Sequence, residues 1–308
     1  MKNKRYQLKP ALILCGAMAA LIIVIFIMAG NKNRNVAKNM KGQLLYDEVS
    51  ADEKSAVVMY DFASGESLRI SEEAGFDDAF GGVFAGENKA AFIARDGERN
   101  GIYIYDYAKK QSDVIALSDD IRYLDLDYCG KKNGFICLCS DVGEWRIEEI
   151  SSDTDNKTEN PLFISENEIY ALKYSEEGDA VYFVHENGNG GGVLKCVKGS
   201  QQTTLYVSEK TRLQGLEVLD KTILVCENGE RGRKIAQYNA KRSALDSLKF
   251  NSDGYECAAV SAVSSTQFIV SADIGGRFEI YVCNGSNIVR AEGINSDKDM
   301  IVSDYIRE

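Results

Sequence analysis

Proline and histidine are almost absent from this chain of 308 residues, which contains 2 Pro, 1 Trp and 1 His. A single histidine excludes a metal site built from several imidazoles of one chain. So little proline excludes collagen-like and proline-rich classes, and a hydrophobic content of 44% is too high for a disordered chain. The sequence therefore predicts a folded protein with a large core.

Acidic residues are absent from the first 41 positions, whereas the rest of the chain is strongly acidic. Eight of the 36 basic residues lie in this leader and all 47 acidic residues follow it, so residues 42–308 have a net charge of −19 (28 minus 47). Such a body repels nucleic acid, whose binding depends on neutralising phosphates. We therefore exclude DNA and RNA as partners.

Residues 11–30 form an uncharged apolar run of 20 residues, which as a helix would cross a hydrocarbon layer of about 30 Å. A cleaved secretory signal is the alternative. The run is longer than a signal normally needs, and Ala29 is preceded two positions earlier by Ile27 rather than by a small residue. We therefore expect a basic cytoplasmic tail (1–10), a retained transmembrane signal anchor (11–30), a linker (31–42) and one domain (43–308).

The membrane orientation depends on weaker signals. Four basic residues precede the span and four follow it, so the positive-inside count is balanced. A short charged tail ordinarily stays in the cytoplasm, which predicts a single-pass protein of the cell membrane with its domain on the extracytoplasmic side. The seven cysteines of the domain argue mildly against this, because secreted domains usually pair theirs. Since Cys137, Cys139, Cys226 and Cys283 lie in apolar runs, we expect free thiols in the core.

Two sequence features recur six times in the domain. Apolar runs with aromatic or β-branched residues begin at 57, 101, 144, 192, 233 and 278, at intervals of 41 to 48 residues. Serines followed by an acidic residue keep the same interval, at Ser71, Ser118, Ser165, Ser208, Ser252 and Ser296. Because two independent features stay in register, the domain is a sixfold repeat.

Each repeat contains short runs rich in Val, Ile, Tyr and Phe, separated by Gly, Asn, Asp and Ser, with no sustained helical period. In the second repeat these runs are 78–85, 89–94, 101–107 and 112–117. Four strands per repeat predict an all-β fold, a six-bladed β-propeller of four-stranded antiparallel blades. The first repeat has only three strands (44–47, 55–62 and 67–70), so we expect residues 299–306 to complete its blade and close the ring.

The stretch 164–192 and the run GIYIYDY at 101–107 resemble the repeat of TolB-type, WD-repeat-like propellers. In that repeat an aromatic-Ser-x-Asp-Gly turn precedes an apolar strand. The turn YSEEG at 174–178 is the nearest match and lacks the usual proline. The resemblance covers roughly residues 43–308 at the level of the fold. It implies a six-bladed ring that binds without catalysis, and it transfers no individual functional residue.

The serine-acid pairs fall in the links between repeats, so a closed ring would gather them on one face around the central channel. We therefore expect an anionic channel mouth that binds a ligand through Asp78, Asp120, Glu166, Glu168, Asp253 and Asp299. Carboxylates suit calcium, a polyamine or a basic peptide. The alternative is that these residues only stabilise turns by accepting hydrogen bonds from nearby backbone N–H groups.

Two further motifs favour structural roles. His185 is the only imidazole, and no G-x-S-x-G nucleophile elbow accompanies it. The run SADIGGRF at 271–278 resembles the Asp-box of sialidases, which is a structural turn in that family, and the family's arginine cluster is not recognisable. We therefore expect no catalytic residue at either position.

These observations predict a membrane-anchored, extracytoplasmic propeller that acts as a non-catalytic binding or scaffold module. Its expected partner is a protein, a cation or a small cationic ligand, with no cofactor unless calcium fills the mouth. One alternative is a carboxylate-dependent hydrolase or lyase acting on carbohydrate. Another is the sensor subunit of a signalling complex, whose output would need a second protein because only about ten residues precede the span.

Overall fold

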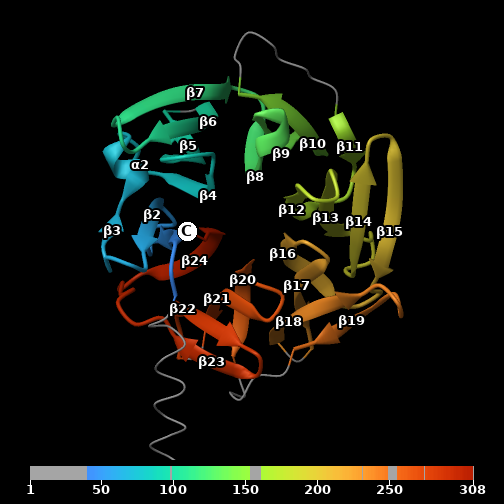
Figure 1. Cartoon of the computed structure of the whole chain (residues 1–308). Helices are drawn as coiled ribbons and strands as arrows, with labels where there is room; N and C mark the ends of the chain where they lie inside the picture. Colours follow the sequence, from blue (N-terminus) through green and yellow to red (C-terminus); the bar gives the residue numbers. More distant parts are fainter. Residues whose placement is uncertain are drawn as a thin grey trace, which may run out of the picture.

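The computed structural model describes residues 40–97, 99–152, 161–230, 232–248, 255–273 and 275–307. These residues form six four-stranded antiparallel sheets around a central axis (Figure 1). The expected six-bladed β-propeller is therefore confirmed. The predicted span at 11–30 lies outside the described residues, and no helix within them is long and apolar enough to cross a membrane.

The blades follow one another along the chain, and in blades 2 to 6 the strand order runs from the axis outward. Blade 2 contains β4 (Ala79–Phe84), β5 (Lys89–Asp96), β6 (Arg99–Asp106) and β7 (Gln111–Ser118). Blade 3 contains β8 (Arg122–Cys129), β9 (Gly134–Asp141), β10 (Glu144–Ser151) and β11 (Pro161–Ser165). Blade 4 contains β12 (Ile169–Ser175), β13 (Ala180–Glu186), β14 (Gly192–Lys198) and β15 (Gln201–Val207). Blade 5 contains β16 (Arg212–Leu219), β17 (Thr222–Gly229), β18 (Gly232–Asn239) and β19 (Ala244–Ser247). Blade 6 contains β20 (Glu256–Ala262), β21 (Gln267–Asp273), β22 (Phe278–Asn284) and β23 (Asn287–Arg290).

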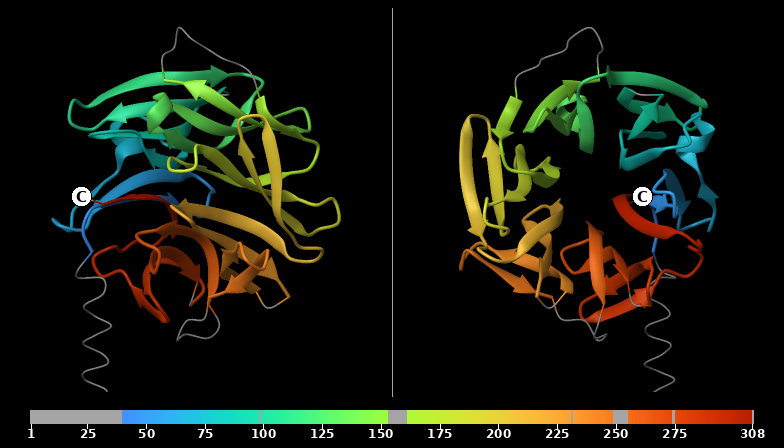
Figure 2. Two further views of the ribbon diagram at one scale, coloured as in Figure 1. Left: turned by 45° about the vertical axis from the view of Figure 1, so that its right-hand side comes forward. Right: turned by 180° about the vertical axis from the view of Figure 1, so that it is seen from behind.

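Blade 1 joins the two ends of the described chain. Its outer three strands are β1 (Gln43–Val49), β2 (Ser55–Asp61) and β3 (Ser67–Leu68), and its innermost strand is β24 (Asp299–Ile306). β24 runs antiparallel to β1, from Gln43 opposite Ile306 to Val49 opposite Asp299. The views turned by 45° and by 180° show the first and last strands together in one sheet (Figure 2). Closure by the C-terminal strand is therefore confirmed.

The hydrophobic core lies between blades rather than within any one of them. Each of the six apolar clusters joins two neighbouring blades, so the ring has one cluster at every blade interface. The six apolar runs that mark the repeat become the third strands β2, β6, β10, β14, β18 and β22. A blade buries both of its faces, which explains why runs such as those of β2 and β6 are apolar on consecutive positions instead of alternating.

One strand boundary in the first blade differs from the sequence prediction. We expect its outer strand to reach Ile70, but β3 ends at Leu68 and a single helical turn, α2 (Ile70–Glu73), follows. Ile70 is 0% exposed in the cluster between blades 1 and 2, and the Ser71 hydroxyl accepts a hydrogen bond of 3.0 Å from the backbone N–H of Val57. The turn is thus held by burial, which a strand pattern does not reveal.

The cysteines of the described domain are free thiols. All of them are buried except Cys196, which is half-buried. Cys137 and Cys139 lie in the same cluster between blades 2 and 3, and burial raises the pKa of both thiols. The cysteines therefore serve as small core residues, as their apolar neighbours in the sequence predict.

Candidate functional site

The serines of the repeat marker stabilise the links between blades. The hydroxyl of Ser118 accepts hydrogen bonds from the backbone N–H groups of Asp120 and Ile121, at 3.2 and 2.8 Å. The hydroxyls of Ser165, Ser208 and Ser296 likewise accept bonds from backbone N–H groups two or three residues onward. The turn-forming alternative therefore holds for these four serines.

The acids predicted at the channel mouth, here called the rim acids, do not share one environment. They are Asp78, Asp120, Glu166, Glu168, Asp253 and Asp299. Asp120, Glu166 and Glu168 are exposed, and Asp253 lies outside the described residues. No three His, Cys, Asp or Glu side chains of the described chain are close enough together to hold a metal ion. Ligand binding by the rim acids stays a prediction.

Two of the rim acids tie neighbouring blades together. Asp78 precedes β4 and accepts a 3.2 Å hydrogen bond from the backbone N–H of Ser55 in blade 1; it also forms a 3.1 Å ion pair with Arg95. Asp299 begins β24 and accepts a 2.8 Å bond from the backbone N–H of Phe278 in blade 6. Both therefore link the start of an inner strand to the third strand of the preceding blade.

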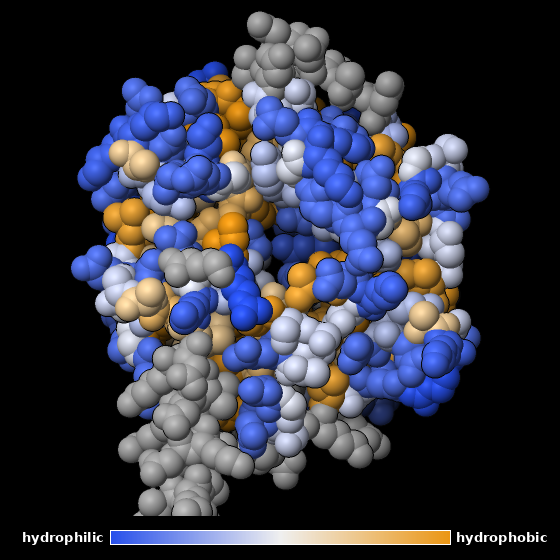
Figure 3. All heavy atoms as spheres, viewed as in Figure 1, coloured by the Kyte–Doolittle hydropathy of each residue, from blue (hydrophilic) through white to orange (hydrophobic). Residues whose placement is uncertain are grey.

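The inner strands of all six blades surround a cavity of about 320 Å³ on the axis. The space-filling view shows the molecule hollowed at the centre of the face in Figure 1 (Figure 3). Every inner strand has a register shift against its neighbour, and the residues at these shifts line the cavity. A bulge turns consecutive side chains away from strict alternation. The bulges thus direct extra side chains to the axis.

Six charged residues lie within or beside this cavity, and we call them the channel cluster. They are Asp47 and Asp304 of blade 1, Asp125 and Asp127 of blade 3, Lys173 of blade 4 and Glu217 of blade 5. The acids thus come from blades 1, 3 and 5, and a single lysine opposes five carboxyl groups. The channel cluster is the most strongly charged buried group among the described residues.

Four of these acids hold the blades together through backbone hydrogen bonds. From blade 1, Asp47 accepts a 3.0 Å bond from Gly81 N–H and Asp304 accepts a 2.8 Å bond from Phe84 N–H, both in blade 2. Gly81 has φ 64°, a conformation that favours glycine. The two acids of blade 3 bond blade 4 in the same way, with Leu172 N–H to Asp125 at 2.9 Å and Tyr174 N–H to Asp127 at 2.6 Å.

Lys173 lies between two acids without a short contact to either. Its Nζ is 3.8 Å from Asp127 Oδ1 and 3.9 Å from Glu217 Oε2. Burial alone would lower the pKa of Lys173, but the charges of Asp127 and Glu217, with smaller effects of Asp304 and Asp125, raise it well above its usual range. Lys173 is therefore a permanent cation of the channel.

The same burial makes the acids hard to ionise. Burial raises the pKa of Asp47 to about 7, against the lowering effect of hydrogen bonds from Gly81, Ser303 and Gly82. Burial raises the pKa of Glu217 to about 7 and that of Asp127 to about 6, although Lys173 lowers both. Asp47, Glu217 and Asp127 therefore titrate near neutral pH, where a bound cation would favour their ionised forms.

Sequence reasoning located the channel but not these residues. Asp125 and Asp127 alternate with apolar residues in the run YLDLDYC, and Asp304 follows an apolar stretch in IVSDYI. A charge inside a predicted inner strand is the available signal, because such a position faces either a neighbouring blade or the axis. The repeat analysis favoured residue types that recur in every blade, whereas the channel positions of the inner strands change residue type, from Asp127 to Lys173 to Glu217.

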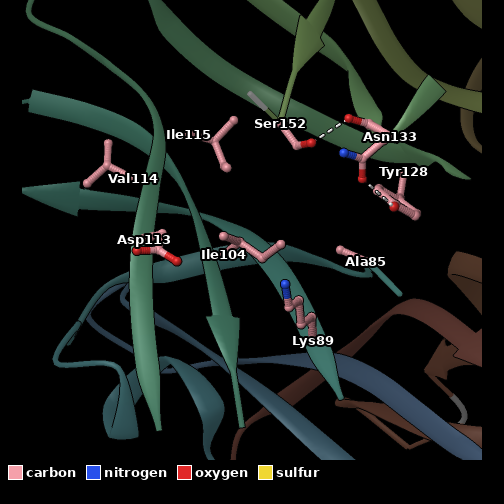
Figure 4. Close-up of a pocket in the computed structure, with 9 residues that line it drawn as sticks. All are labelled: Ala85, Lys89, Ile104, Asp113, Val114, Ile115, Tyr128, Asn133 and Ser152. Atoms are coloured by element: carbon pink, nitrogen blue, oxygen red, sulfur yellow. Dashed lines mark hydrogen bonds between the residues drawn. The ribbon is translucent and has the colours of Figure 1, made fainter. Parts of the chain in front are cut away.

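A second hollow, a groove of about 510 Å³, lies between blades 2 and 3 (Figure 4). Lys89 and Asp113 lie on either side of Ile104 in this view. On its far side the Tyr128 hydroxyl donates a 3.3 Å hydrogen bond to Asn133 Oδ1, and the Ser152 hydroxyl donates to the backbone carbonyl of Asn133. One lysine and one aspartate line the groove, whereas one lysine and two aspartates line the axial cavity, and the groove's lining residues include no buried charged cluster.

His185 lies at a largely buried strand end. It is 7% exposed near the end of β13, its Nδ1 lies 2.7 Å from the backbone carbonyl oxygen of Glu186, and its ring packs near Phe163 and Phe183. Burial lowers its pKa. Asp273 of the Asp-box-like run accepts hydrogen bonds from the backbone N–H groups of Gly275, Gly276 and Arg277, so this run is also a structural turn.

The fold and the axial cavity place the chain in the class of six-bladed β-propellers. TolB from Acinetobacter baumannii has a TM-score of 0.68 and 11% identity, with 87% of this chain and 67% of TolB covered. A structure from a nidogen/laminin complex has a TM-score of 0.62 and 11% identity, with 86% and 97% covered. A puromycin hydrolase mutant complexed with PGG has a TM-score of 0.61 and 12% identity, with 84% of this chain and 48% of that enzyme covered.

The present chain therefore spans about half the length of that hydrolase. No protein-family model matches the chain, and no curated protein matches its sequence. At these identities the structural likeness shows the fold alone. The resemblance to TolB-type propellers is thus confirmed at the level of the fold.

Proposed function

We propose that this protein is a non-catalytic binding module, anchored in the cell membrane by residues 11–30 with its propeller on the extracytoplasmic side, and that it binds a cationic ligand in the central channel. The observation that carries the proposal is the axial cavity of about 320 Å³. Asp47, Asp125 and Lys173 line it, and Asp127, Asp304 and Glu217 lie close enough to act on the charge of Lys173, so acidic groups predominate around the channel and favour cations. The same charges disfavour an anionic ligand.

The hydrogen bonds of the channel cluster support binding rather than catalysis. Both carboxylate oxygens of Asp125, Asp127 and Asp304 accept bonds from backbone N–H groups. Oxygens held in this way are poorly placed to exchange protons with a substrate, whereas a glycosidase needs two carboxyl groups that act on one bond. These three acids therefore shape the site and set its charge.

The known propellers of this shape are consistent with a binding role. One of the similar structures comes from a complex of nidogen with laminin, which is an assembly of proteins. The hydrolase among the similar structures is about twice as long as the region that this chain matches. Because one fold serves many functions, the proposal rests on the channel and uses these likenesses only as support.

Thermal unfolding of the full-length chain in detergent tests the proposal. Candidate cations are calcium, a linear diamine and a lysine-rich peptide, each compared with sodium chloride at equal ionic strength. A ligand that binds the folded state must raise the melting temperature, and 100 times its dissociation constant adds about 2.7 kcal/mol. We expect at least one cation to do so, with no effect of matched anions. If no cation raises the melting temperature, cation binding in the channel is wrong.

Mass spectrometry of the ligand after prolonged incubation tests the absence of catalysis. We expect the bound ligand to be recovered unchanged. A product mass that depends on Glu217 would instead support the hydrolase or lyase alternative.

A further inference from the structure

The two ends of the described chain lie on one face of the ring. Gln43, at the start of β1, is paired with Ile306, at the end of β24. Because the strands of every blade are antiparallel, the loops after the first and third strands lie at this end of the blade, and the links between blades lie at the other end. We call the face that carries residues 40–42, Arg307 and these loops the entry face, and the opposite one the link face.

The entry face is basic, although the domain as a whole is acidic. Its described loops and chain ends contain nine basic and six acidic residues, a net charge of +3. All other positions of residues 42–308 together contain 20 basic and 41 acidic residues, a net charge of −21. The segments of the entry face are 40–42, 62–66, 85–88, 107–110, 130–133, 152, 176–179, 199–200, 220–221, 240–243, 263–266, 285–286 and 307. The fold therefore gathers positive charge on one face of a negative body.

Five of the nine basic residues are exposed and form no ion pair with any carboxylate of the described chain. They are Lys41, Lys131, Lys221, Lys241 and Arg307. The Lys131 ammonium group donates to the backbone carbonyl of Glu176, which leaves its charge uncompensated. These five cations come from blades 1, 3 and 5, so they are spread around the axis and are available to an anionic partner.

An exposed apolar residue lies among these cations, at the point where the described chain begins. Ile306 is 43% exposed and is followed by Arg307. The hydroxyl of its other neighbour, Tyr305, donates to the backbone carbonyl of Lys41, and the Tyr305 ring lies 6.4 Å from the ring of Phe62. Basic residues beside an aliphatic and an aromatic side chain are the combination that binds the surface of an anionic membrane.

The linker predicted at residues 31–42 ends on the entry face. It contains Lys32, Arg34, Lys38 and Lys41 and no acidic residue. Twelve residues span at most about 43 Å when fully extended, so a domain anchored by residues 11–30 stays within that distance of the membrane. Such a tether gives the entry face a high effective concentration at the lipid surface, and a weak attraction is then sufficient for docking.

The acidic link face does not cancel this attraction. The eight residues of β24 extend about 27 Å from one face to the other. Salt screens charges beyond about 8 Å at physiological ionic strength. The rim acids therefore contribute little to the energy of the entry face at a membrane, although they dominate the net charge of the domain.

We infer that the entry face docks on the anionic headgroups of the membrane, an inference that rests on the membrane anchoring in the proposed function. The exposed cations contact lipid phosphates, and Ile306 enters the interface beside them. The link face, with the rim acids, then faces the solution. Because the apolar contact and two of the cations lie where the leader joins the domain, the arrangement favours a membrane over a soluble polyanion.

Lysine labelling of the full-length chain in lipid nanodiscs tests the inference. The discs contain phosphatidylcholine alone or phosphatidylcholine with phosphatidylglycerol, and mass spectrometry follows a water-soluble amine-reactive reagent at each lysine. On the anionic discs we expect Lys131, Lys221 and Lys241 to react about fivefold more slowly than on neutral discs, and high salt should remove the difference. Lys54 and Lys210, exposed in loops of the link face, should react equally on both.

Charge reversal supplies a matched control. Lys198, exposed at the end of β14 on the entry face, serves as the reporter. Combined Lys131→Glu, Lys221→Glu and Lys241→Glu should restore fast labelling of Lys198 on anionic discs. The pair Lys54→Glu and Lys210→Glu should leave Lys198 protected. Equal far-UV circular dichroism and melting temperature of both variants exclude misfolding as the cause.

The outcomes separate docking from the proposed function. If lysines of the entry face react equally on both kinds of disc, or if charge reversal does not release Lys198, docking on anionic lipid is wrong. If only dextran sulfate protects these lysines, the entry face binds a soluble polyanion and lipid docking is again wrong. Washing with alkaline carbonate reports the anchor by itself. Loss of the chain from the discs contradicts the anchoring, whereas a retained chain whose labelling ignores lipid charge contradicts docking alone.

Discussion

The rim acids and the channel cluster are both acidic groups near the axis, but they have different physical roles. Among the rim acids, Asp120, Glu166 and Glu168 are exposed, and Asp78 and Asp299 accept hydrogen bonds from backbone N–H groups of the preceding blade. Channel positions recur, at intervals of 46 and 44 residues from Asp127 to Lys173 and Glu217, but their residue type changes from blade to blade. The channel residues are largely buried, and burial raises the pKa of Asp47, Glu217 and Asp127. In this propeller, therefore, repetition marks what every blade needs in order to fold, whereas the departures from repetition mark the candidate site.

Removal of residues 300–308 should have the largest effect, because it takes away the inner strand of blade 1 together with Asp304. Met300 and Val302 are 0% and 5% exposed in the cluster between blades 6 and 1. The loss leaves an unpaired edge on β1 and opens the ring. We expect aggregation, seen by size-exclusion chromatography. A monomeric truncated chain with native circular dichroism would contradict closure as a requirement for folding.

Asp127→Ala and Asp120→Ala compare one channel acid with one rim acid directly. The first leaves Tyr174 N–H without its acceptor and removes an ion-pair partner of Lys173, so it should cost about 3–5 kcal/mol. The second removes an exposed side chain and should change stability by less than about 0.5 kcal/mol. Urea unfolding measures both values. If both substitutions lower the free energy of unfolding by the same amount, the distinction between channel acids and rim acids is wrong.

Glu217→Gln should alter how stability depends on pH. Because burial raises the pKa of Glu217 from 4.5 to about 7, its protonated form favours the folded state. That contribution is complete below pH 4.5 and is lost as the pH rises through 7. The free energy of unfolding of the variant, relative to that of the native chain, should therefore rise by on the order of 2–3 kcal/mol between pH 5 and pH 8. Urea unfolding at the two pH values measures the gain. If the unfolding free energies of the variant and the native chain change equally between the two pH values, Glu217 has an ordinary pKa.

Ser118→Ala should have a smaller effect than Glu217→Gln and should sharpen the structural role of the links between blades. Its hydroxyl accepts bonds from two backbone N–H groups in a link between blades 2 and 3. Water can replace part of this interaction at an exposed turn, so we expect a loss of about 1 kcal/mol. Denaturant unfolding should also show a larger loss for Ser118→Ala than for Asp120→Ala. The reverse order would mean that the acid, not the serine, holds the turn.

Much of the architecture was predictable because it follows from local pattern. The third strand of every blade was located from its apolar run, and the strand that closes the ring from the missing strand of the first repeat. The helical turn at Ile70 was missed, since its burial against blade 2 is not visible in the local pattern. The channel cluster was missed for a related reason: Lys173 and Glu217 are 44 residues apart in the chain and meet only when blades 4 and 5 pack together.

The amino-acid sequence by itself determined the sixfold repeat, the strand pattern of each blade and the closure of the ring, because backbone pairing and turn chemistry act over a few residues. The tertiary structure alone decided which charges share the channel. Their pKa values depend on burial and on neighbours from other blades, and neither exists until the ring is closed. Asp127, Lys173 and Glu217 come from three different blades and meet only there.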